Sequence, residues 1–290
     1  MFADTPALRV DHPAPTRVGS EDARSWLLVG ASASAPFSFD EAASSRADQV
    51  ILDLEDAVDP SYKDAAREAV VKYLGHGNRA WVRINAVATT FWADDVDALV
   101  GVASLAGVLL AKSESASEVS ETFHRLGAAV PVMPLIESAL GVEAATEIAC
   151  ADGSFRLAFG SGDYRRDTGT GNDNLAMAYP RSRLVVASRI GNLPGPVDGP
   201  TVGTGHPQLR EQVAVSVSLG MTGKLCLDLE QPNVINECMS PSPTDVAWAQ
   251  KFLDEFNRGG QIIRDGSDKP RLALAETITV RAGRFGVTAI

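Results

Sequence analysis

Two acids of this sequence, Glu137 and Asp163, each stand just beyond a short apolar run. Hard divalent cations such as Mg²⁺ prefer oxygen ligands and usually take only one or two protein carboxylates, with water and substrate completing the octahedron. Glu137 and Asp163 could therefore share one Mg²⁺ ion, although Asp163 could instead cap the turn that follows it. Gly160 and Gly162 would let the backbone approach such a site closely.

Arg83 ends another apolar run and presents a planar fork of donors that matches a carboxylate with two hydrogen bonds. We assign Arg83 to the carboxylate of a small acid, with Asn85 and Gly162 as further substrate-binding residues. A metal ion beside this arginine would hold an α-oxo acid and stabilise the enolate that forms when the bond to a second fragment breaks. These residue types indicate aldol or Claisen cleavage.

Three more acids, Asp53, Glu55 and Asp56, follow a third apolar run. Buried carboxylates generally need partners, so Asp53 and Asp56 are interpreted as structural acids paired with Lys112 or Arg83. Glu55 could equally hold a metal-bound water, and we include it among the catalytic candidates. Lys112 is interpreted as an ion-pair partner rather than a Schiff-base nucleophile, because acids rather than an apolar pocket surround it.

These residues must be positioned by apolar runs that lack strict alternation, each followed by an amphipathic stretch. Strands covered by helices on both faces have this pattern, so it predicts a parallel α/β fold. Eight such units favour a closed (β/α)₈ TIM barrel with a C-terminal helical extension, with an open doubly wound sheet as the alternative. In a barrel the residues above would converge at the carboxyl ends of the strands. The predicted strands are 26–31, 50–54, 80–85, 108–112, 130–137, 156–160, 190–194 and 224–228.

The remaining segments are assigned to helices, loops and terminal extensions. One helix is predicted after Pro60, with Lys63, Arg67 and Lys72 on its polar side. Segment 161–179 is rich in Gly, Asp, Asn and Thr and is interpreted as an active-site loop. Other helices are predicted at 94–102, 117–126, 140–150, 175–188 and 207–219. The domains are then a loose N-terminal arm over 1–24, the barrel over 25–240, and over 241–290 a helix at 243–257 and a tail through 269–284, which could pack on a neighbouring subunit.

The composition narrows the partners and the compartment. A hydrophobic share of 45% allows a sizeable core, whereas a net charge of −11 argues against a surface that binds nucleic acid. No apolar run approaches the roughly 20 residues that a membrane span needs. The first residues lack the apolar centre of a secretory signal, so the cytoplasm is the expected location.

Cysteine and histidine are too sparse to bind a metal here. Cys150, Cys226 and Cys238 have no regular spacing, and none of the four histidines falls in a pair at zinc-ligand spacing. Any metal must therefore be held by carboxylates. Cys226 is expected to pack within the eighth strand.

At these residues the sequence resembles the citrate lyase β-subunit-like family of the HpcH/HpaI aldolase/citrate lyase superfamily, which includes malyl-CoA lyases. The resemblance spans roughly residues 26–231. It is carried by segments 51–58 (Ile-Leu-Asp-Leu-Glu-Asp-Ala-Val, with Lys63 and Arg67 following), 81–85 (Trp-Val-Arg-Ile-Asn), 135–138 (Leu-Ile-Glu-Ser), 159–163 (Phe-Gly-Ser-Gly-Asp) and 196–200 (Pro-Val-Asp-Gly-Pro).

The resemblance implies a barrel in which Glu137 and Asp163 bind Mg²⁺ and Arg83 contacts substrate. It also implies a carbon–carbon lyase that converts a citryl-like or malyl-like thioester to an oxo acid and an acyl thioester. The expected partner is thus a small oxo or hydroxy acid, either free or as a coenzyme A or acyl-carrier thioester, and the expected assembly is a homotrimer or homohexamer.

Two segments depart from the family pattern. Residues 30–37 hold no Lys or Arg where the family usually has a basic segment that grips the thioester carrier, and Asp228 with Leu229 replaces a His-Pro pair. Asp228 is therefore a candidate carboxylate base. The departures leave open a metal-dependent enzyme that acts on a free acid or hydrolyses a thioester, and a non-catalytic barrel that binds small acids.

Overall fold

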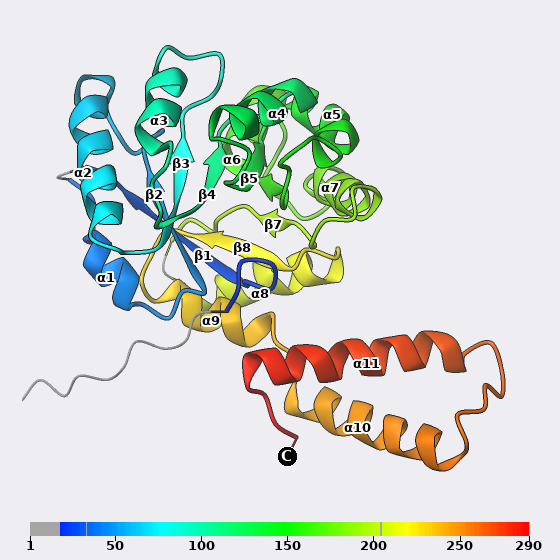
Figure 1. Cartoon of the computed structure of the whole chain (residues 1–290). Helices are drawn as coiled ribbons and strands as arrows, with labels where there is room; N and C mark the ends of the chain where they lie inside the picture. The colour runs from blue at the N-terminus through cyan, green and yellow to red at the C-terminus, as the bar shows by residue number, and fades with distance from the viewer. Residues whose placement is uncertain (1–17, 33, 204, 290) are drawn as a thin grey trace, which may run out of the picture.

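The chain folds as a closed barrel of eight parallel strands surrounded by helices (Figure 1). The computed structural model describes residues 18–32, 34–203 and 205–289. The strands are β1 (Ser25–Gly30), β2 (Gln49–Asp53), β3 (Ala80–Ile84), β4 (Leu105–Leu110), β5 (Val132–Ile136), β6 (Ala158–Phe159), β7 (Val197–Asp198) and β8 (Gly223–Cys226). The helices are α1 (Phe39–Ser44), η1 (Pro60–Tyr62, a 3₁₀ turn), α2 (Lys63–Gly75), α3 (Phe91–Leu99), α4 (Ala116–Arg125), α5 (Ala139–Ala149), α6 (Ser161–Thr168), α7 (Ala178–Ile190), α8 (His206–Ser218), α9 (Gln231–Cys238), α10 (Pro243–Arg258) and α11 (Asp268–Phe285). The predicted barrel with a C-terminal helical extension is confirmed.

Side chains along each strand alternate between the barrel interior and the surrounding helices. Trp26 and Trp81 belong to an interior cluster, whereas their neighbours Leu27 and Val82 pack in the larger core beneath the helices. The two indole rings meet edge to face with centroids 5.3 Å apart. A Cβ on Gly107 would fall 2.3 Å from the Trp81 ring, so glycine is needed there for this ring to fill the barrel. Because both faces are buried, the strands read as apolar runs without alternation.

Arg156 and the segment before β1 close the amino-terminal end of the barrel. Arg156 is fully buried, and burial lowers its pKa to about 9. Its Nη1 donates to the carbonyl oxygens of Ser20 at 3.1 Å and Ala23 at 2.9 Å, and Ala23 is itself part of the interior cluster. The prediction of a loose arm is therefore wrong for residues 18–24, because the barrel interior is plugged at this end. The earlier part of the predicted arm lies outside the described residues.

Two predictions for the later strand–helix units are wrong. No strand forms at 190–194, since Ile190 is the last residue of α7 and β7 follows at Val197–Asp198. With two residues, β7 is too short to leave a hydrophobic pattern. The predicted loop over 161–179 begins as helix α6, whose first turn carries Asp163, a charge that the helix dipole stabilises.

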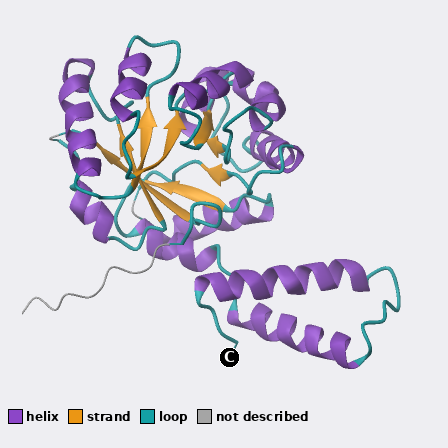
Figure 2. Cartoon of the chain, viewed as in Figure 1, coloured by secondary structure: helices purple, strands orange, loops and turns teal. Residues whose placement is uncertain are grey.

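The chain ends in a hairpin of α10 and α11 that extends away from the barrel (Figures 1 and 2). The predicted tail over 269–284 is helical instead, because Ala275 packs against Phe252 in a small core between the two helices. Beside β1, the Arg24 guanidinium carbon lies 4.1 Å from the ring centre of Phe285 and so ties the end of α11 to the barrel. Packing of the hairpin on a neighbouring subunit stays a prediction.

Within the described part of the chain, every helix is too short or too polar to cross a membrane. Cys226 is buried in β8 as predicted, and burial raises the pKa of its thiol. It is thus a packing residue with little thiolate character.

Candidate active site

Arg83 on β3 is held at the barrel mouth by two acids from β2 and the turn after it. Its Nε donates to Asp53 Oδ1 at 2.7 Å and its Nη2 to Asp53 Oδ2 at 2.5 Å, while Nη1 lies 3.0 Å from Glu55 Oε2. Burial acts to lower the pKa of this guanidinium, but the charges of Asp53 and Glu55 outweigh burial and raise it. The fork that we assigned to a substrate carboxylate is thus filled by Asp53 in this structure.

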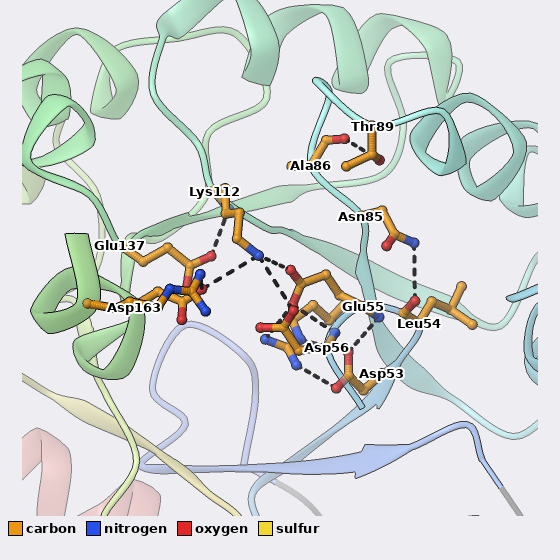
Figure 3. Close-up of polar contacts among 12 residues, drawn as sticks. Asp53, Leu54, Glu55, Asp56, Asn85, Ala86, Thr89, Lys112, Glu137 and Asp163 are labelled. Atoms are coloured by element: carbon orange, nitrogen blue, oxygen red, sulfur yellow. Dashed lines mark hydrogen bonds and ion pairs between the residues drawn. The ribbon is translucent and has the colours of Figure 1, made fainter. Parts of the chain in front are cut away.

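Lys112, two residues after β4, lies between two groups of acids (Figure 3). Its Nζ pairs with Glu55 and lies 3.6 Å from Asp56 Oδ1 and 3.5 Å from Asp163 Oδ2. Its backbone has a φ of 48°, a left-handed conformation that costs about 1 kcal/mol or more outside glycine. In this conformation its N–H donates to Glu137 Oε1 at 2.9 Å. The predicted ion-pair role of Lys112 is confirmed.

Glu137 follows β5 and is 94% buried at the barrel mouth, since 6% of its surface is exposed. Burial raises the pKa of its carboxyl to about 8; the Lys112 N–H opposes this shift, and the charge of Glu55 adds to it. Gly160 makes room for the side chain, because a Cβ there would lie 2.2 Å from Glu137 Oε2. Deprotonation of Glu137 near neutral pH therefore calls for a compensating cation.

Asp163 lies beside Glu137 in the first turn of α6 (Figure 3). Its Oδ2 is buried and accepts no hydrogen bond, although Arg166 Nη2 lies 3.2 Å away and Lys112 Nζ 3.5 Å away. Both acids line a pocket of about 220 Å³, together with Lys112, Glu114, Ser138, Arg166 and Asp167. The two residues predicted to bind metal are thus brought to one pocket.

The side chains of this pocket fit a hard divalent cation. Glu137 and Asp163 offer carboxylate oxygens, and one of these is buried without a hydrogen-bond partner. No cluster of three or more acids, cysteines or histidines with the geometry of a metal site occurs in the described residues. A pair of carboxylates suits Mg²⁺, which keeps positions for water and substrate. The assignment of these two acids as ligands remains a prediction.

Asn85 and Lys63 form a buried support beneath the tip of β2. Lys63 Nζ donates to Leu54 O at 2.6 Å, to Glu55 O at 2.7 Å and to Asn85 Oδ1 at 2.9 Å. The Asn85 amide in turn donates to Asp95 Oδ2 at 2.6 Å. These bonds fix the backbone that presents Glu55, and they use both ends of the amide that we assigned to substrate. The prediction that Lys63 lies on the polar side of its helix is wrong, because it is buried.

Two further candidates are Gly162, which lies on an open part of α6, and Asp228, which lies in the turn before α9. A Cβ on Gly162 would meet no atom within 4 Å, so this part of α6 faces open space. Asp228 Oδ1 accepts from the N–H of Glu230 at 2.9 Å and so caps the turn before α9. Sequence reasoning missed Arg166; a helical reading of residues 161–168 would have placed it one turn after Asp163.

Replacement of Arg83 by lysine is expected to lower the free energy of unfolding by about 1–3 kcal/mol, because buried acceptors on Asp53 and Glu55 lose donors that an ammonium cannot replace in the same geometry. Urea unfolding followed by circular dichroism measures this change. Replacement of the exposed Arg189 by lysine serves as the control and should alter the value by less than about 0.5 kcal/mol. Equal stability of the two variants would contradict the role given to Asp53.

The fold and this site define a TIM-barrel protein with a carboxylate pocket at the carboxyl ends of its strands. The chain belongs to the HpcH/HpaI aldolase/citrate lyase family, whose model matches residues 27–228. The model of the HpcH/HpaI aldolase C-terminal domain matches residues 244–286, which cover most of the α10–α11 hairpin.

Relatives and solved structures agree with this membership. A citrate lyase subunit beta-like protein of Mycobacterium tuberculosis is 34% identical over 275 residues, which cover 89% of this chain and 95% of that protein. An L-malyl-CoA/beta-methylmalyl-CoA lyase of Rhodobacter capsulatus is 29% identical, covering 85% of this chain and 87% of the lyase. The structure of CitE from Mycobacterium tuberculosis in complex with magnesium, acetoacetate and coenzyme A superposes with a TM-score of 0.76 at 31% identity, covering 91% of this chain and 99% of that one.

Proposed function

We propose that this protein is a Mg²⁺-dependent carbon–carbon lyase that cleaves a citryl-like or malyl-like hydroxyacyl thioester to an oxo acid and an acyl thioester. The observation that carries the proposal is the pairing of Glu137 with Asp163, whose buried Oδ2 has no hydrogen-bond partner, in one small pocket. The magnesium in a relative's structure and the malyl-CoA lyase activity in another relative's name support it.

In this reaction a bound Mg²⁺ supplies Lewis-acid polarisation of the substrate oxygens. The protein residues contribute fixed charge and proton transfer around it. Lys112 and Arg83 supply positive charge beside the pocket, and Glu55 holds both of them in place through ion pairs. Asp228, which follows β8 at the same end of the barrel, is the proposed base that takes the hydroxyl proton. The carbon–carbon bond then breaks, its electrons move into the thioester fragment, and water supplies the proton that the carbon of this fragment gains.

A second candidate function, action on a free oxo or hydroxy acid, is favoured by a groove beside β1. The groove holds about 610 Å³ and opens at Gly30, the residue that ends β1. The described residues that line it carry no charged side chain and are Gly30, Ala31, Ser32, Ser34, Ala35, Phe37, Ser38, Phe39, Tyr62, Ala65, Ala66 and Ala69. Such a surface would attract the phosphates of a nucleotide-bearing carrier poorly.

Two measurements test these functions. Purified protein with Mg²⁺ is expected to release an oxo acid from malyl or citryl thioesters of coenzyme A, and a chelator should stop the release. Calorimetric titration with acetyl-coenzyme A separates the candidates, since binding in the micromolar range supports the thioester lyase. Turnover of a free hydroxy acid without acetyl-coenzyme A binding would support the second function, and the absence of turnover on every substrate would reject both.

A further inference from the structure

Arg166 is a cation of the pocket that is held by a single acid. Its side chain is 72% exposed and its Nη2 lies 3.2 Å from Asp163 Oδ2, one helical turn earlier on α6. In the described residues, Asp163 is the acid within 4 Å of this guanidinium, whereas Lys112 lies within that distance of three acids. Displacing Arg166 therefore breaks fewer ion pairs than displacing Lys112.

The oxygen that Arg166 approaches is the one that a metal ion would need. Asp163 Oδ2 is buried and lacks a hydrogen bond, so its charge is balanced by Arg166 and Lys112 at 3.2 Å and 3.5 Å. A divalent ion coordinated by this oxygen competes with the guanidinium for the same charge. The arginine of this pair is 72% exposed, and water weakens an ion pair of that kind, so a doubly charged ion can displace Arg166 without altering the fold.

A displaced Arg166 remains at the pocket wall and is free to bind an anion. The other guanidinium at the barrel mouth, Arg83, already has Asp53 on its fork and Glu55 on its third nitrogen. Lys112 is likewise paired with Glu55. Among the described residues, Arg166 is therefore the guanidinium near the pocket whose acid partner would leave it when the metal binds, and the planar donors of a guanidinium match a carboxylate.

We propose that Arg166 occupies Asp163 in the metal-free protein, moves away when Mg²⁺ binds, and then holds the second carboxylate of a small oxo-dicarboxylic acid. This inference rests on the proposed function and names the substrate class of the same site. The oxo group and first carboxylate face the metal ligands, and the second carboxylate reaches Arg166 across a pocket of about 220 Å³. The residue thus selects a dicarboxylate over the corresponding monocarboxylate.

Calorimetric titration with Mg²⁺ alone tests the first half of the proposal. Arg166→Gln is expected to bind Mg²⁺ about two- to fivefold more tightly than the natural protein, because the competing cation is gone. Arg165→Gln is the matched control, since it removes the same charge from the same helix but from a residue that forms no ion pair with Asp163. Its Mg²⁺ affinity should change less than twofold. If Arg166→Gln bound Mg²⁺ no more tightly than the control does, Arg166 would not compete with the ion for Asp163.

Titration of the Mg²⁺-loaded proteins with oxaloacetate and with pyruvate tests the second half. Arg166→Gln should lower the affinity for oxaloacetate about tenfold and the affinity for pyruvate less than twofold, because pyruvate lacks the second carboxylate. An equal loss for both acids, or no loss for either, would overturn the role of Arg166. If the natural protein bound no Mg²⁺, the proposed function itself would fail, so the two failures are distinguishable.

Discussion

Replacement of Glu137 by glutamine is expected to lower Mg²⁺-dependent turnover about a thousandfold. Glutamine keeps the volume of the side chain but removes one of the two pocket carboxylates that we propose as metal ligands. Lewis-acid stabilisation by a bound metal is worth several kcal/mol, and each 1.36 kcal/mol corresponds to a factor of ten in rate. Steady-state assays over a range of Mg²⁺ concentrations measure the loss, and calorimetry with Mg²⁺ alone should show that binding is lost with it.

The same variant should change how the stability of the metal-free protein depends on pH. Burial raises the pKa of Glu137 from 4.5 to about 8, so the folded chain keeps a proton that the unfolded chain releases above about pH 4.5. The folded state therefore loses stability as the pH rises from about 5 to 8.5, and Glu137→Gln should be the more stable protein at pH 8.5. Thermal unfolding with a chelator at pH 6 and pH 8.5 measures this difference.

Mg²⁺ binding by the natural protein should strengthen about tenfold for each unit by which the pH rises toward 8, because the ion must displace the proton on Glu137. Glu147→Gln on α5 is the control for both experiments, since this acid is exposed and far along its helix from the pocket. It should leave turnover and the pH dependence unchanged. Full metal-dependent turnover of Glu137→Gln would show that Glu137 is not a ligand.

The parts of the site that could be predicted from sequence are those whose position follows from strand periodicity alone. Arg83 is the last residue but one of β3 and Glu137 follows β5, so a closed barrel must bring them to one mouth. Their electrostatic partners could not be predicted in the same way. Asp53 takes the fork of Arg83 because the two stand side by side on neighbouring strands, and this register is set by the pairing of β2 with β3 rather than by the hydrophobic pattern of either strand.

Short and polar elements account for what the sequence pattern missed. β7 has two residues, and α6 carries so many polar side chains that its sequence predicts a loop. A loop over this segment gives no reason to place Arg166 beside Asp163, because residues three apart meet only when the segment is helical. Lys63 was misplaced for a related reason: it lies at the start of α2 and turns back to bond the carbonyls at the tip of β2.

Replacement of Gly160 by alanine is expected to weaken Mg²⁺ binding by about ten- to a hundredfold, the range found when groups that orient a metal ligand are altered. The new Cβ would lie 2.2 Å from Glu137 Oε2 and 2.5 Å from Glu137 Cβ, so the whole side chain must move rather than its flexible end alone. The backbone itself tolerates alanine, because Gly160 has a φ of −92° and a ψ of 78°. Calorimetry with Mg²⁺ measures the loss of affinity.

Gly162→Ala makes the same chemical change two residues later and meets no atom within 4 Å. Its Mg²⁺ affinity should stay within about twofold of the natural value, and its stability could rise by up to about 1 kcal/mol because alanine favours the helix. The two variants therefore distinguish a glycine that leaves room for Glu137 from a glycine that lies on an open helix surface. If both alanine variants bound Mg²⁺ equally well, Glu137 would not be held where a cation needs it, and the space left by Gly160 would have to serve packing alone.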